Sequence, residues 1–167
     1  MKRKINRYRV LIGLLISVVA SAFFPGKNIR SPFYQEDIRH AIMDDRWDFT
    51  ADHAQPSYGR SRTIMGSYFV QCRKDTLIVS LPYYGKLNSA AGATNDNPLD
   101  FKSTNSKIEK QEKKKGKWLV TVKPENSEVQ SMSFTFFDNG SAQVNFIMTN
   151  RSGINFSGKV SPPKRPA

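Results

Sequence analysis

The sequence has 167 residues, with 26 Lys or Arg against 14 Asp or Glu, so its formal net charge is +12 at neutral pH. This length is sufficient for one hydrophobic core, and a single cysteine excludes an internal disulfide. Removing the five basic residues found among the first nine lowers the net charge to +7. That moderate excess does not indicate nucleic acid as a partner.

The first 22 residues have the pattern of a secretory signal peptide. The basic start is followed by a 15-residue apolar run, residues 10–24, interrupted only by two serines. Ala20 and Ala22 have the small side chains that signal peptidase requires. The run is shorter than the roughly 20 residues of a membrane-spanning helix. We therefore expect cleavage after Ala22, export to the periplasm or beyond, and no transmembrane span in the mature chain. No cysteine lies near the site, so the protein is not expected to be a lipoprotein.

Residues 23–31 read as a leader, and a helix is expected next. Ser31 is a suitable N-cap, and Pro32 is suited to the first helical position. Glu36 and Asp37 add the negative charge that a helix N-terminus favours. Apolar residues then recur at helical spacing, which predicts an amphipathic helix from Pro32 to Asp45. These residues are Phe33, Ile38, Ala41, Ile42 and Trp47.

After Trp47 the apolar residues alternate with polar ones at a period of two. Such alternation is typical of antiparallel strands with one buried and one solvated face. Short connections rich in Gly, Asn and Asp favour hairpins between successive strands. The sequence therefore predicts a mostly β fold of about seven or eight strands in a meander, curved into an open barrel or a two-layer sandwich. We expect one domain over 32–160 and a disordered tail over 161–167. The alternating segments are 47–51, 63–72, 76–81, 118–123, 131–136, 142–149 and 154–160.

The order of these segments resembles a known family. The residues that carry the resemblance are GSYFV (66–70), SLPYYGKLNSA (80–90), FFDNGSAQVNF (136–146) and INFSG (154–158). Together they resemble a secreted Bacteroidetes family catalogued as domain of unknown function 4251, over Asp37 to Gly158. The resemblance implies export and a compact, strand-rich domain that follows a helix. No catalytic residues are established for that family, so it assigns none to this sequence.

The sequence contains no pattern typical of a catalytic or metal site. His40 and His53 are the only histidines, and the carboxylates of DDRWD (44–48) fit a helix end in solvent better than a cation site. No serine lies in a nucleophile-elbow pattern, and no glycine-rich loop is suited to a phosphate. We predict no catalytic residue, metal or cofactor. Paired carboxylates from distant strands remain an alternative, because such pairs need not be close in sequence.

The sequence LPYYG (81–85) introduces the longest connection, from Pro82 to Pro98. Alternation directs Tyr83 into the core and Tyr84 outward or toward the loop. An exposed tyrosine beside an asparagine-rich loop suits a ligand site, and its candidate residues are Tyr84, Lys86, Asn88 and Asn95. The alternative is that both rings close the end of the core, with their hydroxyls bonded to loop backbone.

The segment KIEKQEKKKGKW (107–118) is the most basic stretch of the mature chain. It reads either as a solvated hairpin turn or as an electrostatic contact with an anionic surface. The candidate contact residues are Lys113, Lys114, Lys115 and Lys117. Taken together, the sequence favours an exported, non-catalytic binding module for an envelope glycan, lipid or protein. The alternative is a small periplasmic hydrolase, and the oligomeric state stays open.

Overall fold

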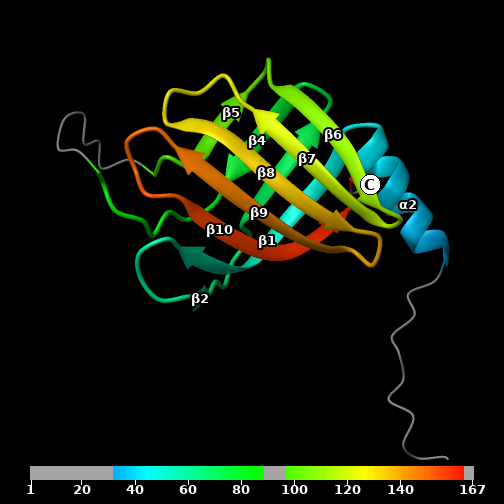
Figure 1. Cartoon of the computed structure of the whole chain (residues 1–167), viewed down its shortest axis with the longest axis horizontal. Coiled ribbons are helices and arrows are strands. Elements are labelled where there is room, and N and C mark those ends of the chain that lie inside the picture. The colour runs from blue at the N-terminus through cyan, green and yellow to red at the C-terminus, as the bar shows by residue number, and fades with distance from the viewer. Residues whose placement is uncertain (1–31, 89–96, 164–167) are drawn as a thin grey trace, which may run out of the picture.

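The computed structural model describes residues 32–88 and 97–163, in which one helix packs on a single antiparallel sheet (Figure 1). The predicted signal peptide, the leader, Asn95 and the last four residues of the predicted tail lie outside these ranges. The elements are α2 (Pro32–Met43), β1 (Arg46–Pro56), β2 (Arg62–Thr63), β3 (Phe69–Arg73), β4 (Thr76–Ser80), β5 (Asp100–Ser103), β6 (Lys107–Lys114), β7 (Lys117–Lys123), β8 (Val129–Phe137), β9 (Ser141–Met148) and β10 (Ile154–Ser161).

The strands lie around an open half-barrel in the order β5-β4-β3-β1-β10-β9-β8-β7-β6. The short β2 lies off this path and pairs with β1. The first long strand pairs with the last, since Phe49 lies opposite Val160 and Pro56 opposite Ile154. The edges β5 and β6 do not pair with each other, although residues 104–106 connect them directly. A continuous curved sheet therefore forms, and it corresponds to the open barrel of the two expected architectures.

A buried hydroxyl stabilises the corner between the two edge strands. The Ser103 Oγ accepts hydrogen bonds from the Glu125 backbone N–H and from the Ser106 hydroxyl, each at 3.0 Å. Ser103 and Ser106 are both buried. Because a buried polar group without a partner is costly, these bonds are what allow two serines to lie inside the corner.

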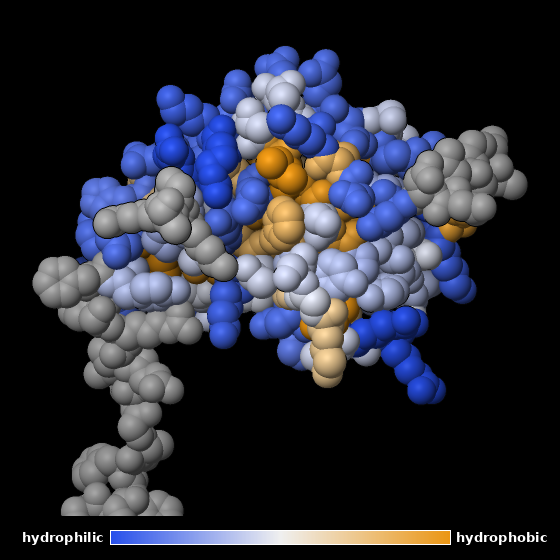
Figure 2. Space-filling view, turned by 180° about the vertical axis from the view of Figure 1, so that it is seen from behind, coloured by the Kyte–Doolittle hydropathy of each residue, from blue (hydrophilic) through white to orange (hydrophobic). Residues whose placement is uncertain are grey.

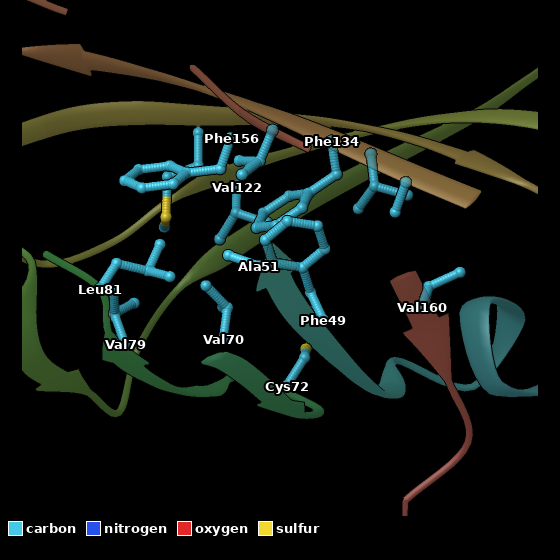
Figure 3. Packing of buried hydrophobic residues seen from close by; sticks show 14 of the residues in the cluster. Phe49, Ala51, Val70, Cys72, Val79, Leu81, Val122, Phe134, Phe156 and Val160 are labelled. Carbon is cyan, nitrogen blue, oxygen red and sulfur yellow. The ribbon is translucent and has the colours of Figure 1, made fainter. Parts of the chain in front are cut away.

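The core lies between the walls of the half-barrel, where side chains from β1, β3 and β4 meet those from β7, β8 and β10 (Figure 3). Trp47 is the largest of them, and its ring centroid lies 4.8 Å from Phe134 and 4.9 Å from Phe136 in edge-on contacts. Cys72 is buried among these residues, as its strand position predicts. The inward residues are the apolar half of each alternating segment, so the period-two pattern determines which face is buried.

The helix packs against β1 and β10 through Ile38, Ala41 and Ile42, which are buried. It ends at Met43, two residues before the predicted end, and Asp45 has a positive φ of 53°. The Lys110 ammonium joins this end of the helix to β6, lying 2.6 Å from the Met43 carbonyl and 2.7 Å from the Asp45 carboxylate. Among the described residues, no helix is both long and apolar enough to span a membrane.

The described sheet has ten strands where the sequence indicated about seven or eight. The expected strand over 63–72 is divided into β2 and β3 near Gly66, whose φ of 136° interrupts the pairing. β5 and β6 lacked the alternating signal because they are edge strands, and β6 has only Ile108 partly buried.

The face of the molecule that is turned away from the viewer in Figure 1 is shown in Figure 2. Hydrophilic residues cover most of this face and surround a smaller apolar patch.

Candidate functional site

The segment Tyr83 to Asn88 is fixed against the turn between β9 and β10. The Tyr83 hydroxyl donates to the Ser152 carbonyl at 2.7 Å, and the Lys86 N–H donates to the Ser152 Oγ at 2.8 Å. The Asn88 N–H donates to the Asn150 carbonyl at 2.9 Å. Gly85 is required here, because a Cβ on it would overlap the Tyr83 hydroxyl and the Ser152 Oγ. Tyr83 therefore closes the end of the core, as one of the two sequence interpretations proposes.

Tyr84 has a different environment from Tyr83. Its ring is half-buried against the core, and the Arg62 guanidinium lies 4.8 Å from the ring centroid. The core and Arg62 therefore both contact this ring, and Arg62 links the β1–β2 hairpin to the tyrosine segment. Lys86, Leu87 and Asn88 are exposed beside it, whereas Asn95 lies outside the described residues.

The lysine-rich segment 107–118 comprises β6, the turn that follows it and the start of β7. Lys113, Lys114 and Lys115 are exposed, and Gly116 has the positive φ of 78° that the turn needs. Lys117 is half-buried, with its Nζ 5.6 Å from the centre of the Phe137 ring. The hairpin tip is thus as the sequence predicts, and contact with an anionic surface stays a prediction.

Two of the three carboxylates of residues 44–48 are held by cations of this chain. Asp45 pairs with Lys110, and Asp48 lies 2.7 Å from the Arg73 guanidinium. His40 is exposed and pairs with Glu36 at 3.2 Å, one turn earlier in the helix. Within residues 32–88 and 97–163, no group of three or more His, Cys, Asp or Glu side chains is placed to hold a metal ion.

A groove of about 500 Å³ lies on the outer face of the sheet, across β8, β9, β10 and β1. β8, β9 and β10 are at the front of Figure 1, so this face is turned toward the reader. Ala54, Val144 and Phe156 border it, but their side chains belong to the core. The polar side chains that line the groove are His53, Gln55, Ser61, Ser133, Thr135, Gln143, Asn145, Asn155 and Ser157.

Strand register aligns eight of these side chains in two parallel rows. The first row runs across four strands and consists of Ser133, Asn145, Asn155 and Gln55. The second row is displaced by two residues along each strand and consists of Thr135, Gln143, Ser157 and His53. Each strand therefore contributes one pair of polar side chains, and Ser61 of the β1–β2 hairpin adds another at the β1 side.

Most of the polar groups that line the groove are hydroxyls and amides. Among the described residues that line it, none is Asp, Glu, Lys or Arg, although these types make up 24% of the sequence. The Asn145 Nδ2 donates to the Asn155 Oδ1 at 2.6 Å, which leaves further donors and acceptors on both amides. Gln55, Gln143, Ser133, Thr135 and Ser157 make no side-chain hydrogen bond to another described residue. The groove therefore presents hydroxyls and amides that a ligand can bind.

One histidine–carboxylate pair lies at the edge of the groove. The His53 Nδ1 is 2.9 Å from the Asp52 carboxylate, and both side chains are at least half exposed. Ser61, Ser133 and Ser157 line the same groove, but none of the three donates a hydrogen bond to His53. The pair and these serines are thus near one another without the bonded nucleophile–base geometry of a triad.

The sequence alone did not indicate the groove. Its residues on β8, β9 and β10 were expected only on the solvated faces of single strands, His53 was considered only as one of the two histidines, and Gln55 and Ser61 lay outside the predicted strands. The signal in the sequence is a set of alternate positions that all carry uncharged polar side chains. These positions are 133, 135, 143, 145, 155 and 157, and only the strand register shows that they adjoin.

Comparison with known proteins defines the family. Residues 31–160 match the family model described as a domain of unknown function, DUF4251. A crystal structure of a DUF4251 family protein from Bacteroides eggerthii is similar, with a TM-score of 0.56 and 14% sequence identity, covering 78% of this chain and 88% of the other. No curated protein matches the sequence. The chain therefore belongs to the DUF4251 family, as the sequence resemblance indicated.

Proposed function

We propose that this protein is an exported, non-catalytic binding module and that the groove across β8, β9, β10 and β1 is its ligand site. The observation that supports this proposal is a groove of about 500 Å³ in which every polar lining side chain except His53 carries a hydroxyl or an amide. A volume of this size is within the range of small-molecule sites, and a few placed polar groups orient ligands in such sites.

The experiment is a thermal-shift screen of the mature protein against neutral, acidic and basic small molecules, glycans and peptides. A ligand present at a hundredfold above its Kd stabilises the protein by about 2.7 kcal/mol. Asn155→Ala should abolish the shift, because it removes a groove amide. The matched control is Asn105→Ala, an exposed asparagine outside the groove. A shift that persists in Asn155→Ala would place the ligand elsewhere.

Export is part of the same proposal, with the groove acting in the periplasm or outside the cell. The basic start and the short apolar run before Ala22 support it. N-terminal sequencing of the protein from the native envelope fraction should find Phe23 as the first residue. A chain that keeps its first 22 residues would contradict cleavage.

The end of the molecule near Leu87 is proposed as a second contact surface, for an envelope partner. Leu87 is 44% exposed on a backbone fixed to the turn at 150–152. Tyr84, Lys86 and Asn88 lie beside it, and Asn95 follows in the sequence. In a pull-down from envelope extract, Leu87→Ser should lose the partner that wild type retains. The exposed Met65→Ser is the control.

A hydrolase is the second candidate function, and the Asp52–His53 pair beside three groove serines is the observation that favours it. No carboxylate lines the groove, so a mechanism with two carboxylates has no support there. A serine-reactive fluorophosphonate probe tests the candidate. Labelling of wild type that is lost in His53→Ala would favour the hydrolase, and absence of labelling would favour the binding module.

A further inference from the structure

We infer that the groove binds an extended, neutral glycan chain that crosses the strands, so that each strand contacts about one sugar residue. This inference rests on the proposed function, because it identifies the ligand of the same groove. Three features of the groove support it: the chemistry of its lining, the spacing of its two rows, and the loop that borders its β1 side.

The lining chemistry selects an uncharged ligand that is rich in hydroxyl groups. A sugar hydroxyl both donates and accepts hydrogen bonds, and the side chains of Asn, Gln, Ser and Thr do the same. A phosphate or an acidic sugar would be expected to meet Arg or Lys, which give stronger charge-assisted bonds. None of these cations lines the groove. An acyl chain requires an apolar lining, but the apolar side chains at the groove are turned into the core.

The two rows give the ligand its direction. Neighbouring strands are about 4.8 Å apart, which is close to the length of one residue in an extended pyranose chain. A glycan laid across the strands would therefore meet one polar pair per sugar. The pair from β9 is Gln143 and Asn145, and the pair from β10 is Ser157 and Asn155. A peptide that adds to a sheet needs a free strand edge, whereas β8, β9 and β10 are paired on both sides along this stretch and β1 pairs with β2 at His53 and Ala54.

The β1–β2 hairpin borders the groove on its β1 side. Its Ser57 is bonded to the Gly153 carbonyl through both the backbone N–H, at 3.1 Å, and the Oγ, at 2.8 Å. Ser61, at the other end of the same loop, lines the groove. Between them lies Tyr58, which is 64% exposed and is not a lining residue, so the loop carries an aromatic ring for a sugar chain that extends past Ser61.

The test is isothermal titration of the mature protein with neutral β-linked gluco-, manno-, xylo- and chito-oligosaccharides of increasing length. In at least one series, the affinity should rise with each added sugar until about four strands are spanned and then level off. The affinity should be the same at low and high salt, because a neutral glycan forms no ion pair with the protein. Gln143→Ala and Asn155→Ala should each weaken binding about tenfold, a loss of about 1.4 kcal/mol. The control Gln111→Ala, an exposed glutamine on β6, should bind as wild type.

Three other outcomes would overturn the inference, and each has a different consequence. Selective, salt-sensitive binding of acidic glycans would show that charge dominates recognition. Binding of a non-glycan ligand that Asn155→Ala abolishes would refute the glycan but leave the groove as a binding site. If no ligand of any class depends on Gln143 or Asn155, the glycan and the proposed groove both fall. Equal melting temperatures of the variants establish that each one is folded.

Discussion

Tyr83, Gly85 and Ser152 form one connected contact at the end of the core. The Tyr83 hydroxyl reaches the Ser152 carbonyl only because Gly85 has no Cβ in its path. Tyr83→Phe keeps the ring but removes this bond, so the free energy of unfolding should fall by about 1 kcal/mol. Urea denaturation measures the change. Tyr84→Phe is the matched control, since its hydroxyl has no hydrogen bond to a described residue, and its stability should be unchanged.

An equal loss in both tyrosine variants would contradict this assignment, because the loss would then not depend on the hydrogen bond that only the Tyr83 hydroxyl makes. The sequence LPYYG contained the residues of this contact but not their partner. Ser152 lies 69 positions after Tyr83. The residue pattern therefore predicted that Tyr83 points into the core. The carbonyl that accepts the hydrogen bond of its hydroxyl is brought there only by the tertiary structure.

Cys72 makes stability depend on pH in the alkaline range. Burial, with a smaller contribution from the Asp45 carboxylate, raises the pKa of its thiol from 9.0 to about 12, against the opposing effect of Arg73 and Lys110. The folded state holds the thiol proton more tightly than the unfolded state does. Stability is therefore unaffected below pH 9 and falls as the pH rises from 9 toward 12, at up to about 1.4 kcal/mol per pH unit.

Denaturation midpoints measured between pH 7 and pH 11 test this linkage. Lysines and tyrosines also titrate in that range, so the informative quantity is the difference between wild type and Cys72→Ala. The wild type should lose more stability than the variant above pH 9. Parallel pH profiles would contradict the assigned shift. In the native protein at pH 8, the thiol should also react slowly with a disulfide reagent, because the thiolate is the reactive form.

At the scale of elements, the pairing of β1 with β10 depends on a β-bulge opposite Gly158. The register shifts between Ala51 and His53, and the backbone of Thr50 approaches Gly158 so closely that a Cβ would overlap the Thr50 carbonyl. Gly158→Ala should therefore destabilise the protein by about 3 kcal/mol, at the upper end of the range for overpacking. Thermal and urea unfolding measure this loss. Lys159→Ala, an exposed neighbour on the same strand, should change stability by less than about 0.5 kcal/mol.

A Gly158→Ala variant as stable as Lys159→Ala would show that the bulge can move to accommodate a methyl group. The strands in this part of the sheet were predictable, because residues such as Phe146 and Phe156 alternate with polar ones. The edge strands were not, because β6 is exposed on both faces apart from Ile108 and so has no period. Sequence patterns detect a strand by its buried face, and an edge strand with little burial gives little signal.

At the scale of the whole molecule, the candidate ligand site is produced by register and not by any one segment. Gln55 belongs to β1 and Ser133 to β8, yet the two strands between them in the sheet, β9 and β10, place them in the same row. In sequence, each row residue is an ordinary polar position on a wet strand face. The mostly β fold and the helix were therefore predictable from local patterns, whereas the groove requires the pairing of β1 with β10, which no local pattern specifies.

That same pairing joins the two walls of the half-barrel. β10 lies between β1 and β9, so a chain that ends at Asn150 would leave β5-β4-β3-β1 and β9-β8-β7-β6 as separate sheets with new unpaired edges. Exposed edges template intermolecular pairing, and the core residues Ile154, Phe156 and Val160 would be lost. We therefore expect aggregation and no cooperative unfolding transition. A chain that ends at Pro163 keeps every strand and should melt as wild type. Calorimetry and light scattering compare the two, and a cooperative transition in the shorter chain would show that the walls fold independently.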